Sequence, residues 1–182
     1  MIIRQVPIAG AVLVDSEPFS DHRGVFSRFF CSRELAPVLG NRQIVNVNFS
    51  RTTRKGSIRG LHYQRLPYQE MKLVRCLRGA VYDVIVDIRQ DSPTFLSWYA
   101  EILSSINMKM LVVPEGFAHG FQTIEDDSEL LYLSTAFYES GAEGGLRYND
   151  PVLGIEWPLA IGDISEKDAS HPMLDNCHKL SG

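Results

Sequence analysis

The chain has 182 residues, with 22 acidic and 18 basic side chains, and therefore carries a formal charge of −4. This length fits one domain, or at most two small ones, with a hydrophobic core that needs no metal or disulfide to hold it together. The mild acidity gives no electrostatic reason to expect nucleic-acid binding, and the lack of any long apolar stretch argues against a membrane span or a membrane partner.

The first predicted elements lie in the N-terminal part of the chain. The opening segment, MIIRQVPIAGAVLV, contains Arg4 and Pro7, so it is too short and too interrupted for a signal peptide. Residues 32–40 predict a short helix, with Ser32 as its cap and Gly40 as its end. Seven strand-like runs rich in β-branched and aromatic residues follow, at 43–49, 72–77, 80–88, 97–103, 110–113, 120–124 and 129–135.

The arrangement of these runs predicts the fold class. Turn signals such as Gln90-Asp-Ser-Pro93 and Pro114-Glu-Gly116 separate them, and no helical pattern lies between them. Strands in close succession without crossover helices predict an all-β fold, an antiparallel sandwich or barrel. No repeat or linker interrupts the chain, so we expect a single domain over residues 1–182. The segment from about residue 163 is polar and loop-like, and the tail after 175 is expected to fray.

One predicted strand, residues 80–88, alternates clearly enough for its two faces to be assigned. Tyr82, Val84 and Val86 fall on one side, and Asp83 and Asp87 share the other side with apolar residues. Two aspartates on one such face indicate either a polar cavity or strand ends where carboxylates accept hydrogen bonds from turn amides. Both interpretations stay open.

The cysteines and histidines limit the chemistry. Cys31, Cys76 and Cys177 form no close pair, which favours free thiols in a reducing compartment and a cytoplasmic protein. The five histidines are far apart in sequence, so no metal-ligand spacing is present and no catalytic metal is predicted, although three of them could converge in space. Serine-hydrolase, P-loop and dinucleotide fingerprints are also absent, which leaves acid/base chemistry or simple ligand binding.

Motifs spread over nearly the whole chain carry a resemblance to a known family. They are Asp21-His-Arg-Gly24, Arg59-Gly-Leu-His-Tyr-Gln64, Lys72-Leu-Val-Arg75, Gly79 with Tyr82-Asp-Val84 and Val86-Asp87, Ser92-Pro-Thr94, Pro114-Glu-Gly-Phe-Ala-His-Gly-Phe121, Tyr148-Asn-Asp-Pro151 with Gly154-Ile-Glu-Trp-Pro158, and Ser165-Glu-Lys-Asp168. In this order and spacing the sequence closely resembles the dTDP-4-dehydrorhamnose 3,5-epimerase family. The resemblance implies a cupin-type jelly roll, catalysis without metal or other cofactor, and a homodimer that exchanges an N-terminal strand.

The resemblance also implies an activity and its residues. Family members invert C3 and C5 of a nucleotide-linked 4-keto-6-deoxyhexose, a reaction that needs a base, a cation near the C4 oxygen and an acid on the opposite face. By motif, His62 is the base, Lys72 stabilises the enolate and Tyr132 is the acid, while Asp168 fixes the tautomer of His62. The implied substrate-binding residues are Arg59, His119, Asn48 and Gln64, together with Tyr138, Glu143 and an Arg23 that could come from the partner subunit.

Several positions depart from the family pattern. Arg28 replaces a glutamate, Leu133 replaces a frequent lysine, and Val47 and Phe49 replace polar residues on a strand expected to face the cavity. These residues are expected to line the nucleotide or sugar pocket, so dTDP-4-keto-6-deoxyglucose should be turned over less efficiently than another nucleotide 4-keto sugar. Two alternatives therefore accompany the main prediction: a single-carbon epimerase or keto-isomerase acting on a different nucleotide sugar, and a cupin that binds sugars without catalysis.

Overall fold

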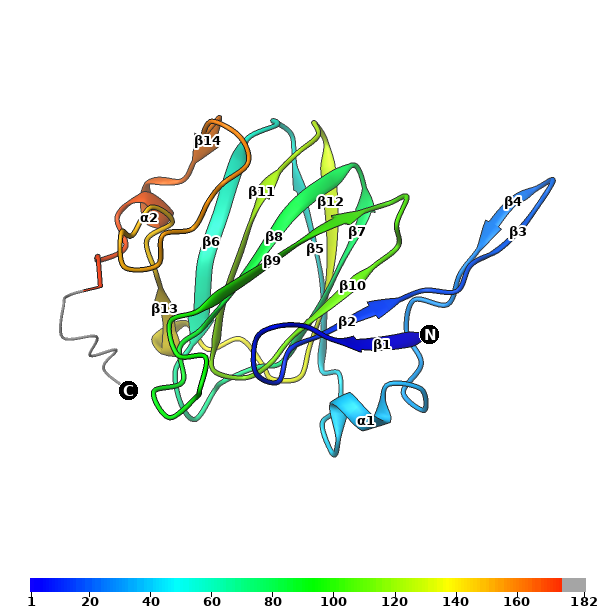
Figure 1. The fold of residues 1–182 in the computed structure, drawn as a ribbon, viewed down its shortest axis with the longest axis horizontal. Helices are drawn as coiled ribbons and strands as arrows, with labels where there is room; N and C mark the ends of the chain where they lie inside the picture. Colours follow the sequence, from blue (N-terminus) through cyan, green and yellow to red (C-terminus); the bar gives the residue numbers. More distant parts are fainter. Residues whose placement is uncertain (175–182) are drawn as a thin grey trace.

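The computed structural model of the protein describes residues 1–174, which form two facing β-sheets (Figure 1). The strand order of the first sheet is β1 (Ile2–Gln5), β2 (Val12–Asp15), β10 (Met110–Val113), β7 (Lys72–Arg78), β12 (Ser128–Ser134) and β5 (Asn46–Thr52). That of the second is β13 (Glu143–Gly145), β6 (Ser57–Gln64), β11 (Phe117–Thr123), β8 (Ala80–Asp87) and β9 (Trp98–Ser104), with β14 (Asp163–Ile164) parallel beside β6. The predicted all-β jelly roll is confirmed.

Three apolar clusters hold the sheets together. The central cluster lies between the sheets and includes Val74, Leu111 and Leu130 from the first sheet and Ile85 and Phe121 from the second. The other two cover the outer faces, one around α1 (Ala36–Leu39) and the other beneath the loops after β13. Because the inner faces are filled by alternate residues of each strand, the strand period determines which side chains can line an internal cavity.

Strand β8 has the two faces that the sequence predicted. Of its two aspartates, one lies at the strand end and binds the following turn, and the other faces a polar interior. Val81 and Ile85 point into the central cluster, whereas Val84 and Val86 pack on the outer face. Asp87, at the end of the strand, accepts hydrogen bonds from the Arg89 amide and from side chains of the following turn. Asp83 lies in mid-strand on the inner face and is fully buried. A polar interior therefore exists beside it.

The helices differ from the prediction. The helix α1 begins only after Leu35 and has no side-chain cap, because Ser32 lies in the preceding turn, while Gly40 ends it with a φ of 57° as expected. A second short helix, α2 (Glu166–Ala169), was not predicted. Ser165 caps it, since its hydroxyl oxygen accepts a hydrogen bond from the Asp168 amide at 3.1 Å. A 3-10 turn, η1 (Ser140–Ala142), precedes β13.

Other elements were also missed or shifted. The hairpin of β3 (Phe19–Asp21) and β4 (Gly24–Phe26) projects away from the sheets (Figure 1). Strand β6 was not predicted, because its polar residues and glycine interrupt the apolar pattern, and β5 starts three residues later than expected. Within residues 1–174 no helix has the length and apolar character to cross a membrane. The tail after 175, where fraying was predicted, lies outside the described residues.

Candidate active site

The facing sheets leave a cavity of about 740 Å³ between them. Its lining includes six of the residues that the sequence assigned to the site: Arg59, His62, Lys72, His119, Tyr132 and Asp168. These side chains come from strands β6, β7, β11 and β12 and from helix α2, which are far apart in the sequence. The fold therefore gathers the proposed acid, base and cation around one space.

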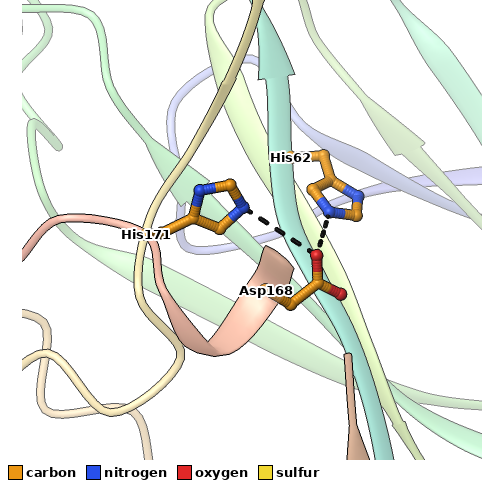
Figure 2. A group of neighbouring side chains, drawn as sticks. All are labelled: His62, Asp168 and His171. Atoms are coloured by element: carbon orange, nitrogen blue, oxygen red, sulfur yellow. Dashed lines mark hydrogen bonds and ion pairs between the residues drawn. The ribbon is translucent and has the colours of Figure 1, made fainter. Parts of the chain in front are cut away.

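A histidine and a carboxylate form a pair on the wall made by the second sheet. His62 Nε2 lies 2.7 Å from Asp168 Oδ1 (Figure 2). The other carboxylate oxygen accepts a hydrogen bond from the Gly60 amide at 3.0 Å. Burial alone would raise the pKa of Asp168, but these two hydrogen bonds outweigh it and lower the pKa. The carboxylate thus stays ionised and holds Nε2 of His62, which leaves Nδ1 free for a substrate.

A register shift brings His62 and Arg59 to the same side of β6. His119 of β11 pairs with His62, whereas Phe121 pairs with Arg59, so three steps on β6 match two steps on β11. In a regular strand, residues three positions apart point to opposite faces. The irregularity lets both the imidazole and the guanidinium face the cavity, which strand period alone would not predict.

The first sheet supplies the opposite wall. Tyr132 is partly buried against the central cluster, and its hydroxyl lies 3.1 Å from the Ser50 hydroxyl of the neighbouring strand. Burial raises the pKa of Tyr132, so the phenol keeps its proton. Lys72, on β7, lies on the same face as Val74 and places its ammonium 3.1 Å from Glu70 Oε1. A protonated phenol and a cation therefore face His62 across the cavity.

A second imidazole–carboxylate pair lies deeper in the interior. His119 Nε2 is 2.9 Å from Asp83 Oδ1, and the His119 ring meets the Tyr132 ring edge-on at 6.1 Å. Asp83 is fully buried, and its Oδ2 has no hydrogen-bond partner among the described residues. The two aspartates on one face of the predicted strand were the signal for this pair, but the partner of Asp83 could not be named from sequence.

The rim of the cavity carries a small polar cluster. Glu143 accepts a hydrogen bond from the Tyr138 hydroxyl at 2.9 Å and one from the Lys167 ammonium at 2.7 Å. The bond from Lys167 lowers the pKa of Glu143, and the bond to Glu143 raises the pKa of Tyr138. Lys167 lines the cavity, although sequence reasoning gave it no role; it directly precedes Asp168 on α2.

Three predicted substrate-binding residues lie elsewhere. Gln64 is buried outside the cavity, where its side-chain amide bonds to the backbone of Tyr68, Phe137 and Glu139, which is a structural use of the side chain. Asn48 pairs with Tyr132 across the strands, but its side chain is exposed and outside the cavity lining. Arg23 sits on the projecting hairpin, paired with Asp21.

The departures from the family pattern also lie outside the cavity, which corrects the expectation that they reshape it. Phe49 pairs with Leu131 and Val47 with Leu133, on the face of the first sheet that turns away from the interior. Both apolar side chains are exposed, at 62% for Val47 and 58% for Phe49. Arg28 pairs with Glu34 near the N-terminus. The argument for a poor thymidine substrate therefore loses its basis.

A histidine that the sequence left unassigned lies next to the His62–Asp168 pair. His171 follows α2, and its ring meets the His62 ring edge-on at 5.9 Å (Figure 2). Its Nε2 is 3.8 Å from Asp168 Oδ1 and is buried, with no hydrogen-bond partner among residues 1–174. Burial, followed by the nearby His62, lowers the pKa of His171 and favours the neutral ring. One atom from each of these three residues lies within 4.8 Å of the others, as metal ligands would.

Comparisons with known proteins agree with this geometry. A relative described as dTDP-4-dehydrorhamnose 3,5-epimerase from Salmonella typhimurium is 40% identical over 177 residues, covering 96% of each chain. The structure of the Bacillus anthracis enzyme of that name, with TDP and PPi bound, has a TM-score of 0.91 at 37% identity and covers 95% of this chain and 99% of its own. The Legionella pneumophila enzyme in complex with dTDP-4-keto-L-rhamnose has a TM-score of 0.89 at 38% identity, with coverage of 94% and 92%.

The family model described as dTDP-4-dehydrorhamnose 3,5-epimerase matches residues 5–176, almost the full length of the chain. The motifs, the jelly roll and the residues around the cavity agree with that match. The chain belongs to the dTDP-4-dehydrorhamnose 3,5-epimerase family.

Proposed function

We propose that the protein inverts C3 and C5 of a dTDP-linked 4-keto-6-deoxyhexose and so serves deoxysugar synthesis for surface polysaccharide. One observation carries the proposal: a carboxylate-held imidazole on one sheet and a partly buried phenol on the facing sheet line the same cavity. Binding alone does not require a base and an acid on opposite walls. The activity named for the relatives, and the keto sugar bound in the Legionella structure, support this substrate class.

The first step is removal of a proton next to the ketone. Asp168 accepts the Nε2 proton of His62, so the lone pair on Nδ1 is free to take the substrate proton. The electron pair of the broken C–H bond moves onto the C4 oxygen and forms an enolate. Lys72 supplies a cation for that oxygen, because an enolate forms readily only where its charge is stabilised.

The second step returns a proton to the other face of the same carbon. Tyr132 gives its hydroxyl proton to the carbon, and the electron pair of the enolate returns to form the C–H bond and the ketone. The tyrosinate then recovers a proton through the cavity, and His62 releases the one it took. The raised pKa of Tyr132 keeps the donor protonated before each turnover. Repetition at the second carbon completes the double inversion.

Basic side chains account for recognition of the diphosphate. Arg51, Arg59 and Lys167 all belong to the cavity lining, and guanidinium and ammonium groups are the usual partners of phosphate oxygens. We assign Tyr138 and Glu143, at the rim beside Lys167, to the nucleoside end of the substrate.

We also propose a homodimer and a cytoplasmic location. In the described chain β1 pairs with its own β2, so the segment available for exchange is the β3–β4 hairpin, which we call the arm. Phe19 and Phe26 on the arm are 81% and 74% exposed, which is costly unless another chain covers them. An arm that reaches the partner would carry Arg23 toward the partner's cavity.

The cytoplasmic location rests on the cysteines. The unpaired thiols of Cys31 and Cys76 fit a reducing compartment.

Deuterium wash-in tests the proposed reaction. The protein is incubated with dTDP-4-keto-6-deoxyglucose in deuterated water, and the sugar is analysed by proton NMR. We expect deuterium at C3 and C5 together with inverted product, at a rate that a strong chelator does not reduce. Exchange at one carbon only would support a single-carbon epimerase, and no exchange would support the non-catalytic sugar-binding alternative. Loss of exchange on chelation, restored by added metal, would contradict the metal-free mechanism.

A further inference from the structure

We propose that His62, Asp168 and His171 form a Zn²⁺ site whose occupation switches the enzyme off. The ligand atoms are Nε2 of each histidine and Oδ1 of the aspartate (Figure 2). The inhibitory part of this inference rests on the proposed epimerase function, whereas the metal site itself rests only on the geometry of the three side chains.

The spacing of the three ligand atoms is close to what zinc requires. Zinc bonds of about 2.0–2.1 Å in a tetrahedral arrangement place neighbouring ligand atoms about 3.3 Å apart. The observed separations from Asp168 Oδ1 are 2.7 Å to His62 and 3.8 Å to His171, one below and one above that value. Bringing these two distances to the tetrahedral value requires shifts of about half an ångström, and the three ligand atoms all lie within 4.8 Å of one another. His62 has room to move, because its side chain is 34% exposed toward the cavity.

The residues around His171 orient its ring toward the Asp168 carboxylate. A side chain at residue 145 would collide with the ring, since a Cβ there would lie 2.2 Å from His171 Nε2, so Gly145 provides the space that the ring fills. The His171 carbonyl accepts a hydrogen bond from the Arg147 side chain at 2.6 Å, which anchors the loop. The ring itself presents to the Asp168 carboxylate a buried Nε2 that has no hydrogen-bond partner in the described part of the chain. A metal ion would satisfy that nitrogen.

Zinc at this position is incompatible with the proposed catalytic cycle. It would replace the proton shared by His62 Nε2 and Asp168 Oδ1, so the carboxylate would no longer support the base. The ion would also withdraw electrons from the imidazole and weaken Nδ1 as a proton acceptor. Imidazole ligands select zinc over magnesium, which prefers oxygen. Lys167 and Arg59 in the cavity lining oppose a cation and limit its affinity.

Zinc binding is measured first, without substrate, by calorimetric titration of Zn²⁺ into the full chain. We expect one zinc ion to bind per chain in the wild type. His171→Phe keeps the ring volume over Gly145 but removes the nitrogen, and His171→Gln provides a second variant of different shape. Both should bind zinc roughly 10- to 100-fold more weakly or worse. His22→Phe, which makes the same change on the exposed arm, should bind like the wild type.

Activity is measured next, by deuterium wash-in at zinc concentrations that fill the wild-type site. The wild type should lose exchange and regain it with chelator, magnesium should have no such effect, and the His171 variants should keep their own zinc-free rates. Equal zinc affinity of wild type and His171 variants would overturn the site, and equal inhibition would overturn its regulatory role. Zinc binding by a protein that shows no exchange would leave the site intact and reject the proposed epimerase function instead.

Discussion

Among single residues, the two imidazole–carboxylate pairs have different surroundings. The His62 side chain is 34% exposed, whereas that of His119 is 6% exposed and its partner Asp83 is fully buried. Only the first ring can move toward a bound sugar without rearranging the core. The exposed fraction of the side chain therefore distinguishes His62, the proposed base, from His119, which lines the cavity from a buried position. The hydrogen-bond lengths of the two pairs are similar and do not distinguish them.

Replacing the proposed base should abolish most proton exchange. We expect His62→Asn to slow deuterium uptake at both carbons by about 10²–10⁴-fold, the usual effect of losing a general base. Arg33→Asn introduces the same side chain at an exposed position outside the cavity lining; it serves as the control and should leave exchange close to the wild-type rate. A rate within a fewfold of the wild type for His62→Asn would assign the base to another residue.

Removing the proposed acid should affect inversion more than exchange. In Tyr132→Phe the base on the opposite wall still removes protons, but the donor for the other face is missing. We expect deuterium to enter with retained configuration while inverted product falls sharply. NMR of the recovered sugar separates the two outcomes. Tyr82→Phe, a change on the outer face against Trp157, is the control. Parallel loss of exchange and inversion in Tyr132→Phe would contradict separate roles for the two walls.

The lowered pKa of Asp168 links folding stability to pH. Because the folded chain favours the carboxylate, the resulting stabilisation is complete above the unfolded pKa of 3.8 and is lost as pH falls through the lower folded value. We expect Asp168→Asn to destabilise the protein near neutral pH and the difference from wild type to shrink in strongly acidic solution. Urea unfolding near neutral pH and in strongly acidic solution measures the free energy of unfolding of both proteins. If the difference between them grew on acidification, the predicted direction of the pH dependence would be wrong.

At the scale of secondary structure, strand irregularities and a short capped helix position the site. The register shift between β6 and β11 turns Arg59 and His62 to one side, and Ser165 orients α2 so that Asp168 meets His62. Strand β13 matters as well, since Gly145 pairs with His62 and lies under the His171 ring. Elements of only three or four residues thus hold the groups that surround the base.

The close approach at β13 can be tested with a methyl group. Gly145→Ala would place its Cβ within 2.2 Å of the His171 ring, so the ring or the strand must move. We expect a loss of about 1–3 kcal/mol in unfolding free energy. Gly141→Ala, whose new methyl group meets only Glu139 at 3.7 Å, is the matched control and should change stability little. Similar stability of the two variants would show that the His171 ring moves aside without lowering the free energy of unfolding.

For the whole molecule, the arm is the feature that a single chain leaves unexplained. It extends from the sheets (Figure 1). Its apolar side chains are exposed, and Arg23 at its turn lies outside the chain's own cavity. A second copy would cover the apolar surface and bring the guanidinium to a diphosphate. The active site would then be completed only in the dimer.

Removing the arm's charge should weaken substrate binding without altering the chemistry. We expect Arg23→Ala to raise KM for the dTDP sugar severalfold with kcat nearly unchanged, since the proton-transfer groups are untouched. Arg33→Ala, another exposed arginine, is the control.

Light scattering should show a dimer for the wild type, and Phe26→Ser should shift it toward monomer. A monomeric wild type with full activity would rule out exchange of the arm.

The sequence by itself determined the strand-rich fold class, the inner and outer faces of β8 and the motif positions of His62, Lys72 and Tyr132, because alternation and short motifs are local properties. Only the tertiary structure decided which face of β5 lines the cavity. A period of two shows that residues 47 and 49 share a face, but pairing with β12 places Ser50 beside Tyr132 and turns Val47 and Phe49 outward. The partners of Asp83 and the approach of His171 were likewise unpredictable, since both depend on contacts between distant segments whose register no local pattern encodes.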